Sequence, residues 1–139
     1  MDVVINYWAI LGCVVAAMVI GTLWYGPVFG KAWMTMTGLT KEGMKSMKMT
    51  PAVAMVGGAI TSFLVAYVLA HGIAFGNAYM GTAGVDGALM GSFWYWLGFA
   101  VPLTAGSFLW EGKSPKLWAL NAGYYLVTLL VMGAIIGSF

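Results

Sequence analysis

Four long apolar segments, each nearly free of charged residues, dominate the sequence; they lie at about 5–25, 51–71, 86–110 and 116–137. Each is long enough to cross the hydrocarbon core of a bilayer, which takes about 20 apolar residues in a helix. Because lipid cannot satisfy exposed backbone groups, spans of this kind fold as helices. The sequence therefore predicts an all-α four-transmembrane-helix bundle that forms a single integral membrane domain over residues 1–139.

Composition supports this class and excludes others. Hydrophobic residues make up 62% of the chain and charged residues 7%, against roughly 25% charged residues in soluble domains. A net charge of +2 without any arginine argues against binding nucleic acid, since arginine is the residue that grips phosphate with two hydrogen bonds. Cys13 is the one cysteine, which excludes an internal disulfide and a multi-cysteine metal site.

The lysines are confined to two of the three loops between the predicted spans. Loop one holds Lys31, Lys41, Lys45 and Lys48, and loop three holds Lys113 and Lys116. With four spans, loops one and three lie on the same side of the membrane. Lysine-rich loops stay in the cytoplasm. We therefore expect a protein of the bacterial inner membrane with both termini outside and with loops one and three cytoplasmic.

Loop one is the longest polar stretch and has a helical pattern of its own. On a helix Lys41, Lys45 and Lys48 would share one face, with Met44 and Met47 beside them. We predict a short interfacial helix there whose lysines, together with Lys31, meet anionic lipid headgroups.

Proline and glycine mark the expected breaks in the helices. Gly26-Pro27 predicts a sharp turn after the first span, and Thr50-Pro51 predicts the start of the second. Pro102 predicts a kink inside the third span. Residues 72–84 and 111–115 are expected to form a loop and a tight turn.

Small residues recur at the spacing that lets two membrane helices approach closely. The expected helix-contact residues are Ala17 and Gly21 on the first span and Ala54, Gly58, Ser62, Ala66 and Ala70 on the second, with Gly133 and Gly137 as a further pair on the fourth. A small-residue ridge gains little by facing lipid. We therefore predict that at least one ridge lies at a protein–protein interface, in a homo-oligomer or in an accessory subunit of a larger membrane complex.

Two stretches of the chain match each other at a constant offset of 86 residues, which pairs Trp8 with Trp94 and Trp24 with Trp110. Within each span the two tryptophans are 16 residues apart, about 24 Å along a helix. One interpretation is a parallel duplication of one helical hairpin. The alternative is convergence, because both spans need aromatic belts at the same depths.

Polar residues gather on the fourth span. Asn121, Tyr125 and Thr128 share a helical face, with Tyr124 beside it. We expect this face to hydrogen-bond to a neighbouring helix; the alternative is a polar lining for a pore. Glu111, close to Lys113, is the best candidate for a specific role, as part of an ion pair at the turn or as a ligand-binding group.

No ionisable residue is expected near the bilayer centre. Proton-coupled transporters and intramembrane enzymes keep such residues for their chemistry. We therefore expect no enzymatic activity and no cofactor. His71 has only Asp86 as a plausible partner and is interpreted as a locally bonded interfacial residue. The methionines of loop one are interpreted as flexible packing residues, with thioether ligation of Cu(I) as the alternative.

Several motifs together resemble a known family. They are WYGPVFGKAW at Trp24–Trp33, GLTKE at Gly38–Glu42, EGKSPKLW at Glu111–Trp118, NAGY at Asn121–Tyr124 and MGAIIG at Met132–Gly137. In this order they resemble the small bacterial membrane proteins of the domain-of-unknown-function family numbered 1761. The resemblance implies a four-helix membrane protein and no assigned activity. Our expectation is thus a structural or interaction subunit whose partners are membrane lipids and other membrane helices; the alternative is a passive channel or facilitator for a small solute, formed by an oligomer.

Overall fold

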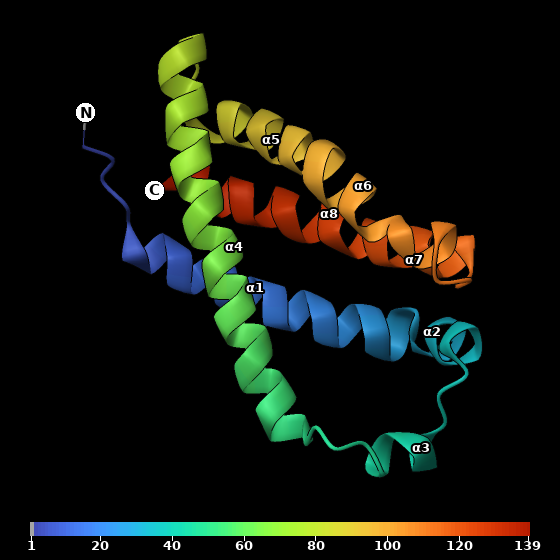
Figure 1. Ribbon diagram of the computed structural model, residues 1–139. Coiled ribbons are helices and arrows are strands. Elements are labelled where there is room, and N and C mark those ends of the chain that lie inside the picture. The colour runs from blue at the N-terminus through green and yellow to red at the C-terminus, as the bar shows by residue number, and fades with distance from the viewer. Residues whose placement is uncertain (1) are drawn as a thin grey trace.

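The chain is helical along nearly its whole length (Figure 1). The structure, a computed structural model, describes residues 2–139, and no strand occurs among them. The elements are α1 (Tyr7–Leu23), η1 (Trp24–Val28), α2 (Gly30–Thr37), α3 (Lys41–Lys45), α4 (Pro51–Met80), α5 (Gly84–Tyr95), η2 (Trp96–Ala100), α6 (Val101–Thr104), α7 (Gly106–Leu109) and α8 (Pro115–Ser138). The all-α class expected from the sequence is confirmed.

Three of the four predicted spans are single helices that are long and apolar enough to cross a membrane. They are Tyr7–Val28, Pro51–Met80 and Pro115–Ser138. The other predicted span follows one path in Figure 1 but is divided into α5, η2, α6 and α7. The π-helical turn η2 precedes Pro102, which lacks the N–H that a regular helix would use. The interruption occurs where Pro102 predicts a kink. Because this segment is not one continuous long helix, the four-span bundle stays a prediction.

Helix α4 is longer than the second predicted span. It begins as expected, with Pro51 in its first turn and the Thr50 side chain accepting a hydrogen bond from the Val53 N–H. It then continues to Met80, so the prediction of a loop at 72–84 is wrong. Gly72 and Gly76 lie inside the helix without ending it. The helix ends only at Gly81, which has a left-handed φ of 68° and caps its C-terminus.

Loop one contains two short helices rather than one. The chain kinks at Gly26, where φ is −109° and ψ is −105°, as the Gly26-Pro27 pair predicts. After α2, the Thr40 side chain caps α3 by accepting from the Gly43 N–H at 2.9 Å. Helix α3 ends at Lys45, so Lys48 lies outside it and the expected common face with Lys41 does not form.

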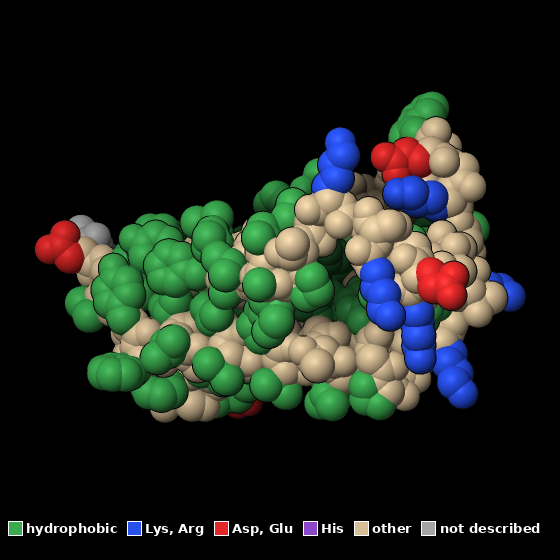
Figure 2. Space-filling view, turned by 90° about the horizontal axis from the view of Figure 1, so that it is seen from below, with side chains coloured by type: hydrophobic (Ala, Val, Ile, Leu, Met, Phe, Trp, Pro, Cys, Tyr) green, Lys and Arg blue, Asp and Glu red, His purple; other side chains and the backbone are tan. Residues whose placement is uncertain are grey.

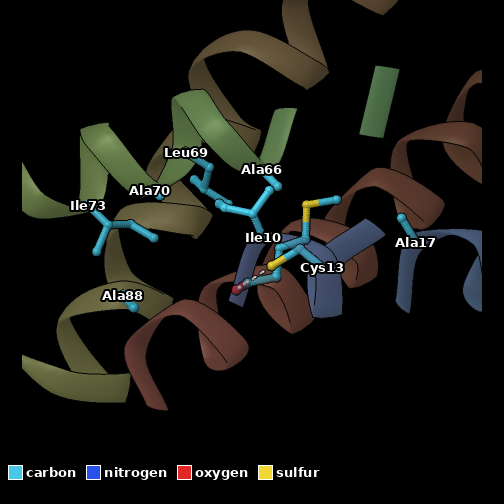
Figure 3. Packing of buried hydrophobic residues seen from close by; sticks show 9 residues of the cluster. Ile10, Cys13, Ala17, Ala66, Leu69, Ala70, Ile73 and Ala88 are labelled. Atoms are coloured by element: carbon cyan, nitrogen blue, oxygen red, sulfur yellow. Dashed lines mark hydrogen bonds between the residues drawn. The ribbon is translucent and has the colours of Figure 1, made fainter. Parts of the chain in front are cut away.

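The helices pack around one small core where α4 crosses α1 (Figures 1 and 3). Helix α1 contacts both α4 and α8, and α8 lies alongside α5. The core is built from Ile10, Cys13, Ala66, Leu69 and Met132, each at most 3% exposed. Cys13 is fully buried, and its thiol donates to the Met132 carbonyl oxygen at 3.5 Å.

Helices α5 and α8 approach each other closely at two glycines of α8. A Cβ atom on Gly133 would clash with the Ser92 side chain and lie 3.0 Å from the Ala88 carbonyl oxygen. One on Gly137 would lie 2.7 Å from the Gly84 carbonyl oxygen. The small pair at the end of the fourth span therefore serves contact within the chain.

The structure does not confirm the internal repeat. Trp24 is half-buried whereas Trp110, its counterpart, is 88% exposed. Gly112 has a φ of 70° and Gly26 a φ of −109°. The α4 helix crosses α1, whereas α8 lies beside α5 (Figure 1). The two hairpins thus differ in their packing.

The lysines gather at one end of the molecule (Figure 2). This is the end formed by α2, α3 and the turn between α7 and α8, while both termini lie at the opposite end (Figure 1). Loops one and three are therefore on the same side of the molecule. This is the arrangement that the lysine distribution predicts, although the side on which the cytoplasm lies stays a prediction.

Candidate binding groove

A large hollow in the described part of the chain is an apolar groove of about 1210 Å³. It lies where the N-terminal half of α4 stands apart from α6 and α8. The α4 wall includes Ala54, Met55, Gly58, Ser62, Leu64, Val65 and Leu69; the facing wall includes Tyr95, Phe99, Leu103 and Thr104. Residues of α1, η1 and α8 form the floor, among them Ala17, Met18, Gly21, Thr22, Tyr25, Tyr124, Tyr125, Thr128 and Met132. Two residue sets that the sequence singles out separately therefore surround one space.

The floor carries the polar groups of the groove. The Tyr25 hydroxyl donates to Asn121 Oδ1 at 2.7 Å, and the Tyr124 hydroxyl donates to the Ala17 carbonyl oxygen at 3.5 Å. Asn121 and Tyr124 thus bond to η1 and α1, whereas a bonding role for the whole predicted face stays a prediction. The hydroxyl of Thr128, a residue that is 6% exposed, has no hydrogen-bond partner within residues 2–139.

Three tryptophan N–H groups fasten α8 to its neighbours. Trp24 donates to the Leu120 carbonyl oxygen at 3.2 Å, and Trp96 donates to the Ala122 carbonyl oxygen at 2.8 Å. Trp118 donates to the Thr104 hydroxyl at 3.0 Å. The floor and one wall of the groove are thus tied together, and the α4 wall has no comparable link to them. The Trp24 ring is half-buried against α8, and its place in an aromatic belt stays a prediction.

The predicted small-residue ridge of α4 is divided between two environments. Ala66 and Ala70 pack in the core at 0% and 7% exposure. Ala54 is exposed and lines the groove together with the half-buried Gly58 and Ser62. The C-terminal half of the ridge is therefore buried in the core, whereas the N-terminal half, where Gly58 approaches Met18, also borders the groove.

On the first helix, the two predicted contact residues both serve packing inside the chain. Ala17 belongs to the core and is 2% exposed. A Cβ atom on Gly21 would lie 3.3 Å from the Tyr124 hydroxyl oxygen. The close approach of α1 to α8 at this point is what the small pair on the first span predicts.

Glu111 lies at the turn before α8 and does not line the groove. Its carboxylate lies 3.4 Å from Lys113 Nζ, and both side chains are largely exposed. This is the ion pair that the sequence suggests, and exposed pairs contribute only about 0–1 kcal/mol. Lys31, Lys41, Lys45 and Lys48 are also exposed and stay candidates for headgroup contact.

The remaining candidate groups do not form a site. His71 makes a local bond, with Nδ1 2.8 Å from the Tyr67 carbonyl oxygen, as expected. It is not at a helix end, because α4 continues for nine more residues. Residues 2–139 contain no group of three or more His, Cys, Asp or Glu side chains that could hold a metal ion. The thioether alternative for the methionines of loop one stays a prediction.

Some groove residues are absent from the sequence-based set of candidates. Tyr25 and Thr104 face α8 through their hydrogen bonds, and Met18 lies 3.5 Å from a Cβ built on Gly58. Tyr25 carries a signal in retrospect, since a tyrosine beside Trp24 at the end of an apolar run offers a hydroxyl near the helix terminus. Met18 and Thr104 carry no such signal, because apolar spans commonly hold residues of these types.

The protein is thus all-helical among the described residues, and three of its apolar helices are long enough to cross a membrane. The sequence matches the family described as protein of unknown function (DUF1761) over residues 8–137. The chain belongs to this family, as its motifs indicate. No curated protein and no solved structure matches it.

Proposed function

We propose that this chain is an integral protein of the bacterial cytoplasmic membrane that works by non-covalent binding in the α4 groove. In this account it is an interaction subunit, as a homo-oligomer or as an accessory subunit of a larger complex. Loops one and three face the cytoplasm and both termini face outward, as the lysine distribution favours.

One observation carries the proposal: the N-terminal half of α4 presents Ala54, Gly58 and Ser62 to an open groove. Residues this small let a neighbouring chain come close to the helix backbone, where it gains dispersion contacts that lipid-facing leucines do not offer. The C-terminal half of the same ridge already packs in this manner against the core.

Adjacent glycines on α4 provide a matched test of this surface. Gly58 lines the groove, whereas Gly57 does not, and a Cβ built on Gly57 meets no atom within 4 Å. Gly58→Leu should abolish oligomer formation or co-purification of a partner, with a loss of affinity of at least about tenfold, because the leucine fills the contact surface. Gly57→Leu should leave both intact. Particle mass and associated proteins are measured after purification in mild detergent.

The proposal fails if wild-type protein is a monomer at micromolar concentration and carries neither protein nor lipid. It also fails if Gly58→Leu and Gly57→Leu have the same effect, because a leucine anywhere on α4 would then have that effect, whether or not it lines the groove.

A second candidate function is passive facilitation of a small polar solute across the bilayer. The observation that favours it is the row of hydroxyls on the groove floor, with the unpartnered Thr128 among them. Proteoliposomes with wild-type protein would then admit glycerol faster than protein-free vesicles, and Thr128→Val would remove the difference. Equal rates in all three samples would exclude this function.

A further inference from the structure

We propose that the occupant of the groove is an anionic phospholipid of the cytoplasmic leaflet, with its acyl chain along α4 and its phosphate among the lysines. This inference rests on the proposed binding function and specifies the partner. It depends on four features of the groove: its volume, its length, the order of its lining residues and the charge at one of its ends.

The volume favours a lipid chain over a complete partner helix. A helix with its side chains is about 10–12 Å across. The groove of about 1210 Å³ could therefore enclose only about 13 Å of helix, or about eight to nine residues; a span of about 20 residues would lie mostly along its open side. The volume also exceeds the roughly 300–1,000 Å³ of pockets for drug-sized ligands, so it leaves room for a larger, chain-like molecule.

The groove is long enough for the chain of a lipid in one leaflet. Its lining on α4 runs from Ala54 to Leu69, about 22 Å at about 1.5 Å per residue. One leaflet contributes about half of the roughly 30 Å hydrocarbon core. A chain that enters beside Ala54 can therefore stay in the groove over its whole depth.

The order of the lining residues matches an amphipathic molecule. Thr22, Tyr25 and Thr104 line the groove near the segments that lead into the lysine-bearing loops. Leu69 and Met132 line its other end, where the core begins, with Thr128 as the one hydroxyl within a turn of Met132. Along α8, Met132 lies about 24 Å beyond Lys116. Hydroxyls therefore stand nearer the end at which a headgroup would sit, and apolar side chains meet the chain terminus.

Charge complementarity identifies the headgroup as anionic. All six lysines lie at this end of the molecule, with Glu42 and Glu111 as the only acidic residues there. Lys31 lies in the first turn of α2, just after the kink at Gly26, and Lys116 lies in the first turn of α8. The two helices that carry the polar floor therefore each lead to a lysine at this end of the molecule. These positive charges attract an anionic phosphate headgroup more strongly than a zwitterionic headgroup, which has no net charge.

The test is native mass spectrometry of the full-length protein in detergent, with phosphatidylglycerol or phosphatidylcholine added as the probe. Wild type should retain phosphatidylglycerol at least about fivefold better than phosphatidylcholine. Gly58→Leu and, independently, Ser62→Leu should lower retention of phosphatidylglycerol about tenfold, and Gly57→Leu should not. The double variant Lys31→Gln/Lys116→Gln should reduce the preference for phosphatidylglycerol about fivefold or more and leave binding of phosphatidylcholine unchanged.

Other outcomes overturn the inference in distinguishable ways. If Gly58→Leu changes the oligomeric mass but not lipid retention, the groove holds a helix, so the lipid inference falls and the proposed function stands. If the groove variants affect neither a protein partner nor lipid, both fall. If phosphatidylglycerol is retained equally by wild type and all variants, the lipid binds elsewhere and the inference is wrong.

Discussion

Replacing Gly133 by Val should destabilise the protein, because it adds bulk where α8 packs tightly on α5. The glycine faces α5, where an added Cβ would clash with the Ser92 side chain and lie 3.0 Å from the Ala88 carbonyl oxygen. Ser92 is fully buried, and its hydroxyl already donates to that carbonyl at 2.8 Å. A valine must displace the serine and push the helices apart. We expect a loss in the free energy of unfolding of about 1–3 kcal/mol.

A glycine on α4 provides the control. A Cβ on Gly76 meets no atom within 4 Å, so Gly76→Val has the same change in helix propensity without the clash. Unfolding of both variants in detergent is followed by circular dichroism against denaturant. Equal midpoints for the two variants would mean that α5 and α8 are not in close contact.

Cysteine labelling in intact bacterial cells should give an all-or-none result. Single cysteines at Ser46 and Ser114, in a Cys13→Ala background, are expected to resist a membrane-impermeant thiol reagent. A cysteine at Ala83, in the loop between α4 and α5, should react completely. The reason is the lysine-rich end, which holds loops one and three and which the positive-inside rule places in the cytoplasm.

Permeabilised cells show whether each cysteine is reactive at all, since Ser46 and Ala83 are both exposed. Labelling at Ser46 but not at Ala83 in intact cells would reverse the orientation. Labelling at only one of Ser46 and Ser114 would show that the two lysine-bearing loops lie on opposite sides, which four spans do not allow.

Local chemistry made much of the fold predictable. Thr50 supplies a side-chain cap and Pro51 needs no N–H partner in the first turn. The predicted start of the second span at Pro51 therefore matches the first residue of α4. Pro102 and the Gly26-Pro27 pair interrupt regular hydrogen bonding wherever they occur in a helix, and both predicted interruptions are present. The end of α4 was not predictable in this way, because glycine weakens a helix without ending it when the surrounding residues remain apolar.

The candidate site was only half predictable for a different reason. Helical periodicity identifies which residues share a face, so the small residues of α4 and the polar face of α8 could both be found. Periodicity does not say where two helices diverge. The groove exists because the C-terminal half of α4 packs through Ala66 and Leu69 while its N-terminal half does not pack on α8. The inward turn of Trp24 is likewise a consequence of tertiary packing.

The central claim is that α4 stands apart from α6 over its N-terminal half, and a pair of spin-label distances in lipid nanodiscs tests it most directly. Labels replace Met55 and Leu103, exposed residues on opposite walls of the groove, and in a second sample Phe75 and Met90, exposed residues where α4 packs on α5. Packed helix axes lie about 8–10 Å apart. We expect a clearly longer distance between labels at Met55 and Leu103 than between labels at Phe75 and Met90. Gly58→Leu should change the Met55–Leu103 distance only if it displaces a molecule bound in the groove. Equally short distances for both pairs would mean a closed bundle with no groove, and would contradict the account.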